Sequence, residues 1–204
     1  MFLAHVHIST GISKLGAQIP SISLPVETTC RPDAPCHKKC YAQRGRFRLP
    51  KCVQRLQTNL DIWQHEPQQY ERDTLIAAFQ ARFFRWHSSG DIPDADYLHM
   101  MVRVAKALPQ TSFLAFTKKW ELVNSYLDTG SALPQNLKIV LSAWGAWIPP
   151  NPHNLPMSYI KFKKGECVVP PTARSCSQYC GDCVITGQSC WDLKSGESVY
   201  FCEH

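Results

Sequence analysis

From residue 50 onward, the pattern of hydrophobic and polar positions switches repeatedly between a helical period and short apolar runs. Val53, Leu56, Leu60 and Trp63 recur at the three- and four-residue spacing that places side chains on one face of a helix. Short runs rich in Phe, Ile, Val and Leu, such as residues 112–119, are typical of buried strands. The pattern predicts strands at 21–25, 84–86, 112–119 and 137–145 with an edge-type strand at 158–165, and helices at 52–66, 68–84, 94–109 and 120–130.

Strands that alternate with helices of ten to fifteen residues predict βαβ units and a mostly parallel sheet. The units are too few for a complete eight-stranded barrel, so we expect an α/β fold, a partial (β/α) barrel. In such folds the chemistry lies in the loops at the carboxyl ends of the strands. Those loops are 87–91, 117–119 and 142–147, together with the cysteine-rich stretch that follows the first strand.

The last part of the chain has a different composition. Proline-rich connectors lead into residues 176–190, where four cysteines occur in fifteen positions with few apolar residues. A segment of this kind needs a metal or a docking surface to become ordered. We therefore expect two units: a partial barrel with its N-terminal cysteine loop over residues 1–165, and a cysteine-rich C-terminal segment packed on it over residues 166–204.

The chain has ten cysteines and no apolar run long enough to cross a bilayer. Its N-terminus lacks the ordered features of a signal peptide, so we expect a cytoplasmic protein without membrane contact. In a reducing compartment, clustered cysteines are more often metal ligands or catalytic groups than disulfides.

Positive charge is concentrated between Arg31 and Arg55. This stretch holds eight Lys or Arg residues and one Asp, an excess of +7, whereas the whole chain has a formal charge of +6, so the rest is close to neutral. A solvated basic loop is the simpler interpretation; a patch that binds nucleic acid is the alternative. The candidate phosphate-binding residues are Lys38, Lys39, Arg44, Arg46, Arg48 and Lys51.

The first cysteine group is Cys30, Cys36 and Cys40. Three thiolates on one loop can hold three irons of a [4Fe–4S] cluster and leave the fourth iron open. Free or partly buried thiols are the structural alternative. The neighbouring basic residues lower thiol pKa values and offset the negative charge of such a cluster.

The second group is Cys176, Cys180, Cys183 and Cys190, which predicts a metal site holding an iron–sulfur cluster or, alternatively, zinc. Part of its spacing, C-x3-C-x2-C, matches the cluster motif of radical S-adenosylmethionine enzymes. Those enzymes carry the motif after the first strand with an aromatic residue before the last cysteine, whereas Asp182 stands there in this chain. We therefore regard that match as accidental.

The strand-end loops add His87, Asp91 and Lys118 as candidate catalytic residues, with His87 as general base and Asp91 as its orienting partner. A tight Ser-Gly-Asp turn with a hydrogen-bonded histidine is the structural alternative. Trp144 and Trp147 are candidates for stacking on a base, or for capping the core.

Several of these segments together resemble a known family. "SLPVETTCRPDAPCHKKCYAQRG", "RWHSSGDIPD", "FLAFTKKWELVN", "LPQNLKIVLSAW" and "CGDCVITGQSCW" are similar to an uncharacterised phage and plasmid "gene product" family, and more distantly to radical SAM-like barrel proteins. The resemblance implies a mobile-element protein with cluster-type cysteines. It matches Cys30, Cys36 and Cys40 to an N-terminal motif, Cys180, Cys183 and Cys190 to a C-terminal motif, His87, Gly90 and Asp91 to an RxHxSGD pattern, and His204 to a terminal histidine.

These observations lead to one hypothesis and two alternatives. The hypothesis is a mobile-element [4Fe–4S] protein that binds DNA or RNA and cleaves it or modifies a base. The first alternative is a radical SAM-type enzyme that uses S-adenosylmethionine at Cys30, Cys36 and Cys40. The second is a non-catalytic, metal-stabilised module for DNA binding or redox sensing. Whether the two cysteine groups make one metal site or two stays open at this stage.

Overall fold

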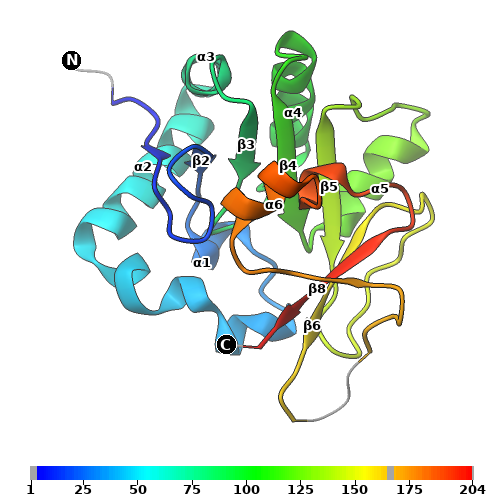
Figure 1. Ribbon diagram of the computed structural model, residues 1–204. Coiled ribbons are helices and arrows are strands. Elements are labelled where there is room, and N and C mark those ends of the chain that lie inside the picture. The colour runs from blue at the N-terminus through cyan, green and yellow to red at the C-terminus, as the bar shows by residue number, and fades with distance from the viewer. Residues whose placement is uncertain (1–3, 165–167, 204) are drawn as a thin grey trace.

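The computed structural model describes residues 4–164 and 168–203, and a single eight-stranded sheet lies at its centre (Figure 1). The strand order is β1-β2-β3-β4-β5-β6-β8-β7. The strands are β1 (Ile8–Ser9), β2 (Ser21–Ile22), β3 (Phe83–Trp86), β4 (Ser112–Thr117), β5 (Leu137–Ser142), β6 (Met157–Lys161), β7 (Arg174–Ser175) and β8 (Ser198–Cys202).

Every neighbouring pair of strands is parallel except β1 and β2. This confirms the expected α/β class and the mostly parallel sheet. The prediction that 158–165 forms an edge strand is wrong, because β6 lies between β5 and β8. The strand that displaces it from the edge, β8, comes from the cysteine-rich C-terminal part. In the described residues no pairing joins β1 to β7, so the sheet is open.

Four long helices follow β2, β3 and β4 along the chain: α2 (Pro50–His65), α3 (Pro67–Ala78), α4 (Ala95–Ala107) and α5 (Trp120–Asp128). Prolines begin α2 and α3, where the missing N–H costs nothing. Asp94 caps α4 by accepting a 2.8 Å hydrogen bond from the Tyr97 amide, a contact of about 1 kcal/mol. Helix α3 ends at Ala78 rather than at the expected residue 84, because the chain must turn before β3 begins at Phe83.

Alternate strand residues face two different cores. Phe84, Trp86 and Phe113 pack with residues of α2, α3, α4 and α5 in the larger core. Leu114 and Val140 face the opposite side, where they pack with Trp191 and other residues of the C-terminal part. The two-residue period of the strands therefore separates a helix-covered face from a second buried face.

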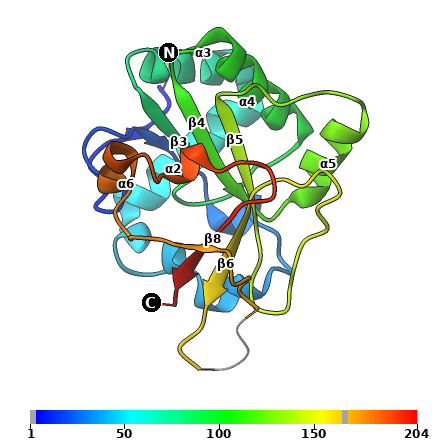
Figure 2. The same cartoon turned by 45° about the vertical axis from the view of Figure 1, so that its right-hand side comes forward.

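The second face is covered by residues 12–19 and by the cysteine-rich part of the chain. Figure 2 shows helix α6 (Cys180–Thr186) and the turn η4 (Cys190–Asp192), coloured orange to red, across the face of the sheet opposite α4. The predicted C-terminal segment thus adds β7 and β8 to the sheet and packs its remaining residues on it. Within the described ranges, no helix has the length and apolar character needed to span a membrane.

Candidate functional site

The three N-terminal thiols lie in the loop that follows the first parallel strand. Helix α1 (Val26–Thr29) comes directly after β2, and Cys30 ends it. Cys36 lies within the short 3-10 turn Pro35–Lys39, which Cys40 ends. These short turns keep the three cysteines half-buried, without disulfides, near the carboxyl ends of β2, β3 and β4.

The three thiols are close enough to act on one another electrostatically. Burial raises the pKa of the Cys30 thiol, and Asp91 and the two other cysteines raise it further. Burial also raises the pKa of Cys36, whereas a hydrogen bond from Lys118 and the charge of that ammonium oppose the rise. The loop therefore gathers three soft ligands beside one cation, a combination suited to an anionic metal centre.

Asp91 fixes this loop against the strand ends. Its carboxylate accepts hydrogen bonds from the Thr117 hydroxyl at 2.6 Å, the Lys118 amide at 2.9 Å and the Ile92 amide at 2.8 Å. Its own amide donates to the Thr29 hydroxyl at 3.0 Å. Because Thr29 immediately precedes Cys30, Asp91 connects the ends of β3 and β4 to the start of the thiol loop.

Gly90 permits the close approach of these segments. Its φ of +80° lies in the left-handed region, and a Cβ there would stand 2.5 Å from the Leu24 carbonyl oxygen and 2.7 Å from the Thr29 hydroxyl. No other residue fits this position without movement of the backbone. The Ser-Gly-Asp turn therefore positions the first thiol site.

His87 lies in the helix-side core. It is 3% exposed, its Nε2 is 3.1 Å from the Tyr97 hydroxyl, and that hydroxyl is 2.7 Å from Tyr70. Burial, reinforced by the charge of Arg85, lowers the pKa of His87 to about 3. A neutral imidazole held among aromatic side chains points to a packing role, so the geometry favours the structural interpretation of this residue.

Ion pairs attach the thiol loop to other parts of the carboxyl edge. Arg31 pairs with Glu121 and with Asp33, and its guanidinium lies over the Trp147 ring at 5.7 Å. Trp147 thus supports the loop. At the far side, Lys39 pairs with Glu203 at 2.7 Å, directly after β8.

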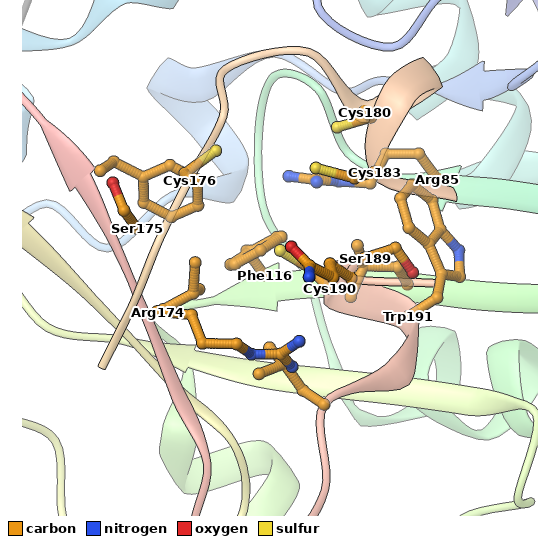
Figure 3. A pocket seen from close by; sticks show the side chains of 15 residues that line it. Arg85, Phe116, Arg174, Ser175, Cys176, Cys180, Cys183, Ser189, Cys190 and Trp191 are labelled. Carbon is orange, nitrogen blue, oxygen red and sulfur yellow. The ribbon is translucent and has the colours of Figure 1, made fainter. Parts of the chain in front are cut away.

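The four C-terminal cysteines meet on the second face of the sheet. Cys176, Cys180, Cys183 and Cys190 line one cavity of about 40 Å³. Figure 3 shows their sulfurs directed toward a common space from the strand β7 side, from α6 and from η4. The predicted grouping of these residues is therefore present.

Local hydrogen bonds hold this segment in place. The Cys180 amide donates to the Lys14 carbonyl at 2.7 Å, which attaches α6 to the N-terminal part. Ser189 and Asp192 form a reciprocal capping box at η4. The Trp191 indole donates to the Phe84 carbonyl at 3.2 Å and so anchors η4 on β3.

The side chain of Arg85 enters the middle of this second group (Figure 3). Burial lowers the pKa of the guanidinium, while Tyr41 and then Cys180, Cys190 and Cys176 counteract this. In the described part of the chain, Arg85 has no ion pair with a carboxylate. Arg85 is half-buried, and its Nε donates to the Trp86 carbonyl at 3.1 Å. Burial raises the pKa of the Cys176, Cys180 and Cys190 thiols, so they would offset its charge only when a bound metal deprotonates them. Sequence reasoning missed Arg85, although a single arginine inside the apolar run FFRW was a usable signal.

The described residues do not form a compact ligand set for one metal ion. Across residues 4–164 and 168–203, no three His, Cys, Asp or Glu side chains stand close enough to hold a single metal ion. A single zinc binds four ligands at roughly 2.0–2.3 Å, whereas the thiolates of an iron–sulfur cluster bind different irons.

The two cysteine groups are separate. None of the three N-terminal cysteines lines the cavity of the C-terminal group. Tyr41 interacts electrostatically with residues of both sites: with Arg85 of the second and with Cys40, Cys30 and Cys36 of the first. Its hydroxyl donates to the Ser88 carbonyl at 2.5 Å.

The candidate phosphate-binding residues are exposed, as a basic surface requires. Lys39 is engaged with Glu203, whereas no ion pair engages the other five within the described ranges. Those five are Lys38, Arg44, Arg46, Arg48 and Lys51. The terminal His204 and Cys167 lie outside the described residues.

Comparison with known proteins identifies a family. The family model described as Gene product 88 matches residues 6–196, so the chain belongs to the Gene product 88 family, a phage-type gene-product family. The comparison with curated proteins gives no match, and neither does the comparison with solved structures.

Proposed function

We propose that this member of the Gene product 88 family is an iron–sulfur protein that binds nucleic acid and acts on it at the carboxyl edge of its sheet. The observation that supports this most directly is the gathering of Cys30, Cys36 and Cys40 beside Lys118, in a loop bordered by exposed basic residues. In the same proposal the sheet and its helices form a partial (β/α) barrel, and the protein works in the cytoplasm.

Cys30, Cys36 and Cys40 would hold a [4Fe–4S] cluster with one open iron, which supplies a Lewis-acid or redox centre when it is bound. The chain's own residues do the rest. Asp91 positions the loop, Lys118 contributes positive charge next to the thiols, and the exposed arginines bind phosphate. Cleavage of a phosphodiester bond and modification of a base are the two reaction classes this arrangement serves.

The C-terminal group would hold a second [4Fe–4S] cluster with all four irons ligated. Four thiols around a buried cavity, with Arg85 among them, match the charge of such a centre. Held by these four thiols, such a cluster would have a structural function, because it would fasten the C-terminal part to the sheet.

Anaerobic purification with iron, sulfide and zinc quantified per chain tests the proposal. We expect about eight irons and eight sulfides, and about four of each when either cysteine group is replaced by alanine. Cys202→Ser, an exposed cysteine outside both groups, is the matched control and keeps the full content. Nucleic-acid binding should weaken steeply with salt. A protein with zinc but no sulfide, or without affinity for nucleic acid, would overturn this reading.

A radical SAM-type reaction is the second candidate. The observation that favours it is the position of the three-thiol loop, directly after the first parallel strand and at the carboxyl edge. Incubation of the reduced protein with S-adenosylmethionine, followed by a search for 5′-deoxyadenosine, distinguishes this candidate function from the first one. Formation of that product in the wild type and its loss in Cys36→Ala would replace the first candidate with this one.

A further inference from the structure

A groove of about 530 Å³ is lined by residues that precede and follow the thiol loop in the sequence. It is bordered by α1, by the 3-10 turns Tyr41–Gln43 and Gly45–Arg48, and by the first turns of α2. This volume is within the range of roughly 300–1,000 Å³ that holds small organic ligands. The residues that line the groove flank the thiol loop in the sequence, since α1 ends at Cys30 and the first of these turns begins after Cys40.

The apolar wall of the groove is suited to a flat ring. Phe47, Val53 and Leu56 line it, and Val53 is 51% exposed although it is hydrophobic. The Phe47 ring is held edge-on by Tyr41, with centroids 5.9 Å apart and an interplanar angle of 67°. An aromatic ring fixed in this way is a platform on which a nucleobase can stack.

The same groove offers polar side chains to the edge of such a base. Glu27 and Gln43 line the same groove. In the part of the chain that the structure describes, no hydrogen bond or ion pair engages the Glu27 carboxylate, and the Gln43 amide makes only a 3.4 Å contact with His37. A carboxylate accepts hydrogen bonds from the amino group of a base, and an amide side chain can both donate and accept.

Arg48 lines the groove, and further cations belong to the chain segments that border it. Arg44, Arg46, Arg48, Lys51 and Arg55 are all exposed, and over residues 4–164 and 168–203 none of them pairs with a carboxylate. Positive charge along a groove that also has an aromatic platform is the combination found in proteins that bind single strands. A duplex keeps its bases stacked inside and could not use Phe47.

We infer that this groove binds an unpaired base of a single-stranded nucleic acid, with Phe47 stacked on it, Glu27 and Gln43 at its edge, and the arginines on the flanking phosphates. This inference rests on the proposed function and deepens it, because it names the substrate form. The stacked base would lie next to the loop that holds Cys30 and Cys40, where a base-directed reaction needs it.

Binding of short single-stranded DNA and RNA to the anaerobically purified full chain tests this inference. Fluorescence anisotropy gives the affinity, and a 2-aminopurine base in the strand reports stacking by loss of its emission. We expect quenching by the wild type and about tenfold weaker binding by Phe47→Ala, with little quenching. Phe47→Leu, which keeps an apolar side chain, should show the same loss of quenching. Phe79→Ala, an exposed phenylalanine at the end of α3, is the matched control and binds like the wild type.

A further comparison of variants separates the contribution of the arginines to binding from that of the Phe47 ring. Replacing Arg44 and Arg46 by glutamine should reduce the slope of log affinity against log salt by about 1.4, whereas Phe47→Ala leaves this slope unchanged. Salt-dependent binding that neither Phe47 variant changes, or equal affinity for a matched duplex, would contradict base binding in the groove. Either result would still be compatible with the proposed function. A wild type that binds no nucleic acid at all overturns the proposed function itself.

Discussion

The guanidinium of Arg85 lies 4.3 Å from the ring centroid of Phe116, on the side of the sheet where four cysteines meet. The two side chains come from neighbouring parallel strands, in a cavity lined mainly by thiols and apolar groups. A cation in this place stabilises a negatively charged centre and destabilises an empty one.

The exchange Arg85→Met should therefore have opposite effects on the two states of the protein. With iron and sulfide bound, we expect the variant to lose about 3 kcal/mol of stability and to release the second cluster first. Stripped of metal, the same variant should melt at a higher temperature than the wild type. Melting curves before and after chelation, with iron content measured, check this. Arg82→Met, an exposed arginine just before β3, is the control; equal shifts in both states would contradict the charge argument.

Gly90→Ala should destabilise the fold and loosen the first thiol site. We expect a loss of about 3 kcal/mol in the free energy of unfolding, because the new methyl group meets the Leu24 carbonyl oxygen in addition to an unfavourable φ. Gly130→Ala is a close control, since its φ is +81° and nothing lies within 4 Å of its Cβ. It should cost about 1 kcal/mol. Denaturant unfolding gives the free energy of unfolding of both variants. Similar losses of stability in the two would show that the contact with Leu24 is unimportant.

Asp91→Asn should release the thiol loop while leaving the second cysteine group intact. The amide keeps one acceptor oxygen where the carboxylate offers two to Thr117, Ile92 and Lys118. We expect about half the iron of the wild type and about 2 kcal/mol less stability. Thr117→Val, which removes one of these donors, should cost less and keep the iron. Full iron content in Asp91→Asn would mean that the loop does not depend on this carboxylate.

The buried His87 predicts a dependence of stability on pH. Its pKa is about 3 in the folded protein against an ordinary value of 6.5, so only the unfolded chain takes up this proton between those values. Between pH 6.5 and about 3, stability should fall by about 1.4 kcal/mol for each pH unit. His87→Gln should remove this contribution from the pH profile of the melting temperature.

Tyr97→Phe removes the hydroxyl next to His87 but leaves the imidazole, so it should lower stability without removing the slope. If His87→Gln and the wild type lose stability in parallel on acidification, the imidazole is protonated in the folded protein.

The sequence predicts the central strands best, since β3, β4 and β5 are short, mainly apolar runs bounded by turn residues. It predicts α4 for a local reason, the Asp94 cap. It misses β8, whose residues SVYFC lie among cysteines and polar turns and pair with β6 only through contacts distant in sequence. The two cysteine groups were visible as spacings in the sequence. Their separation depends on how the chain folds, and the presence of Arg85 in the second group depends on the face of β3 to which its side chain points.

The pairing of Lys39 with Glu203 has a consequence for biosynthesis. Lys39 of the thiol loop pairs with Glu203, which is synthesised much later. The second face of the sheet likewise stays uncovered until residues 176–202 have been synthesised. The nascent chain therefore exposes soft ligands and apolar strand surface during translation. If the thiols hold iron–sulfur clusters as we propose, iron and sulfide should be delivered after synthesis of β8, and cells limited in cluster assembly would accumulate this chain in an immature, protease-sensitive form.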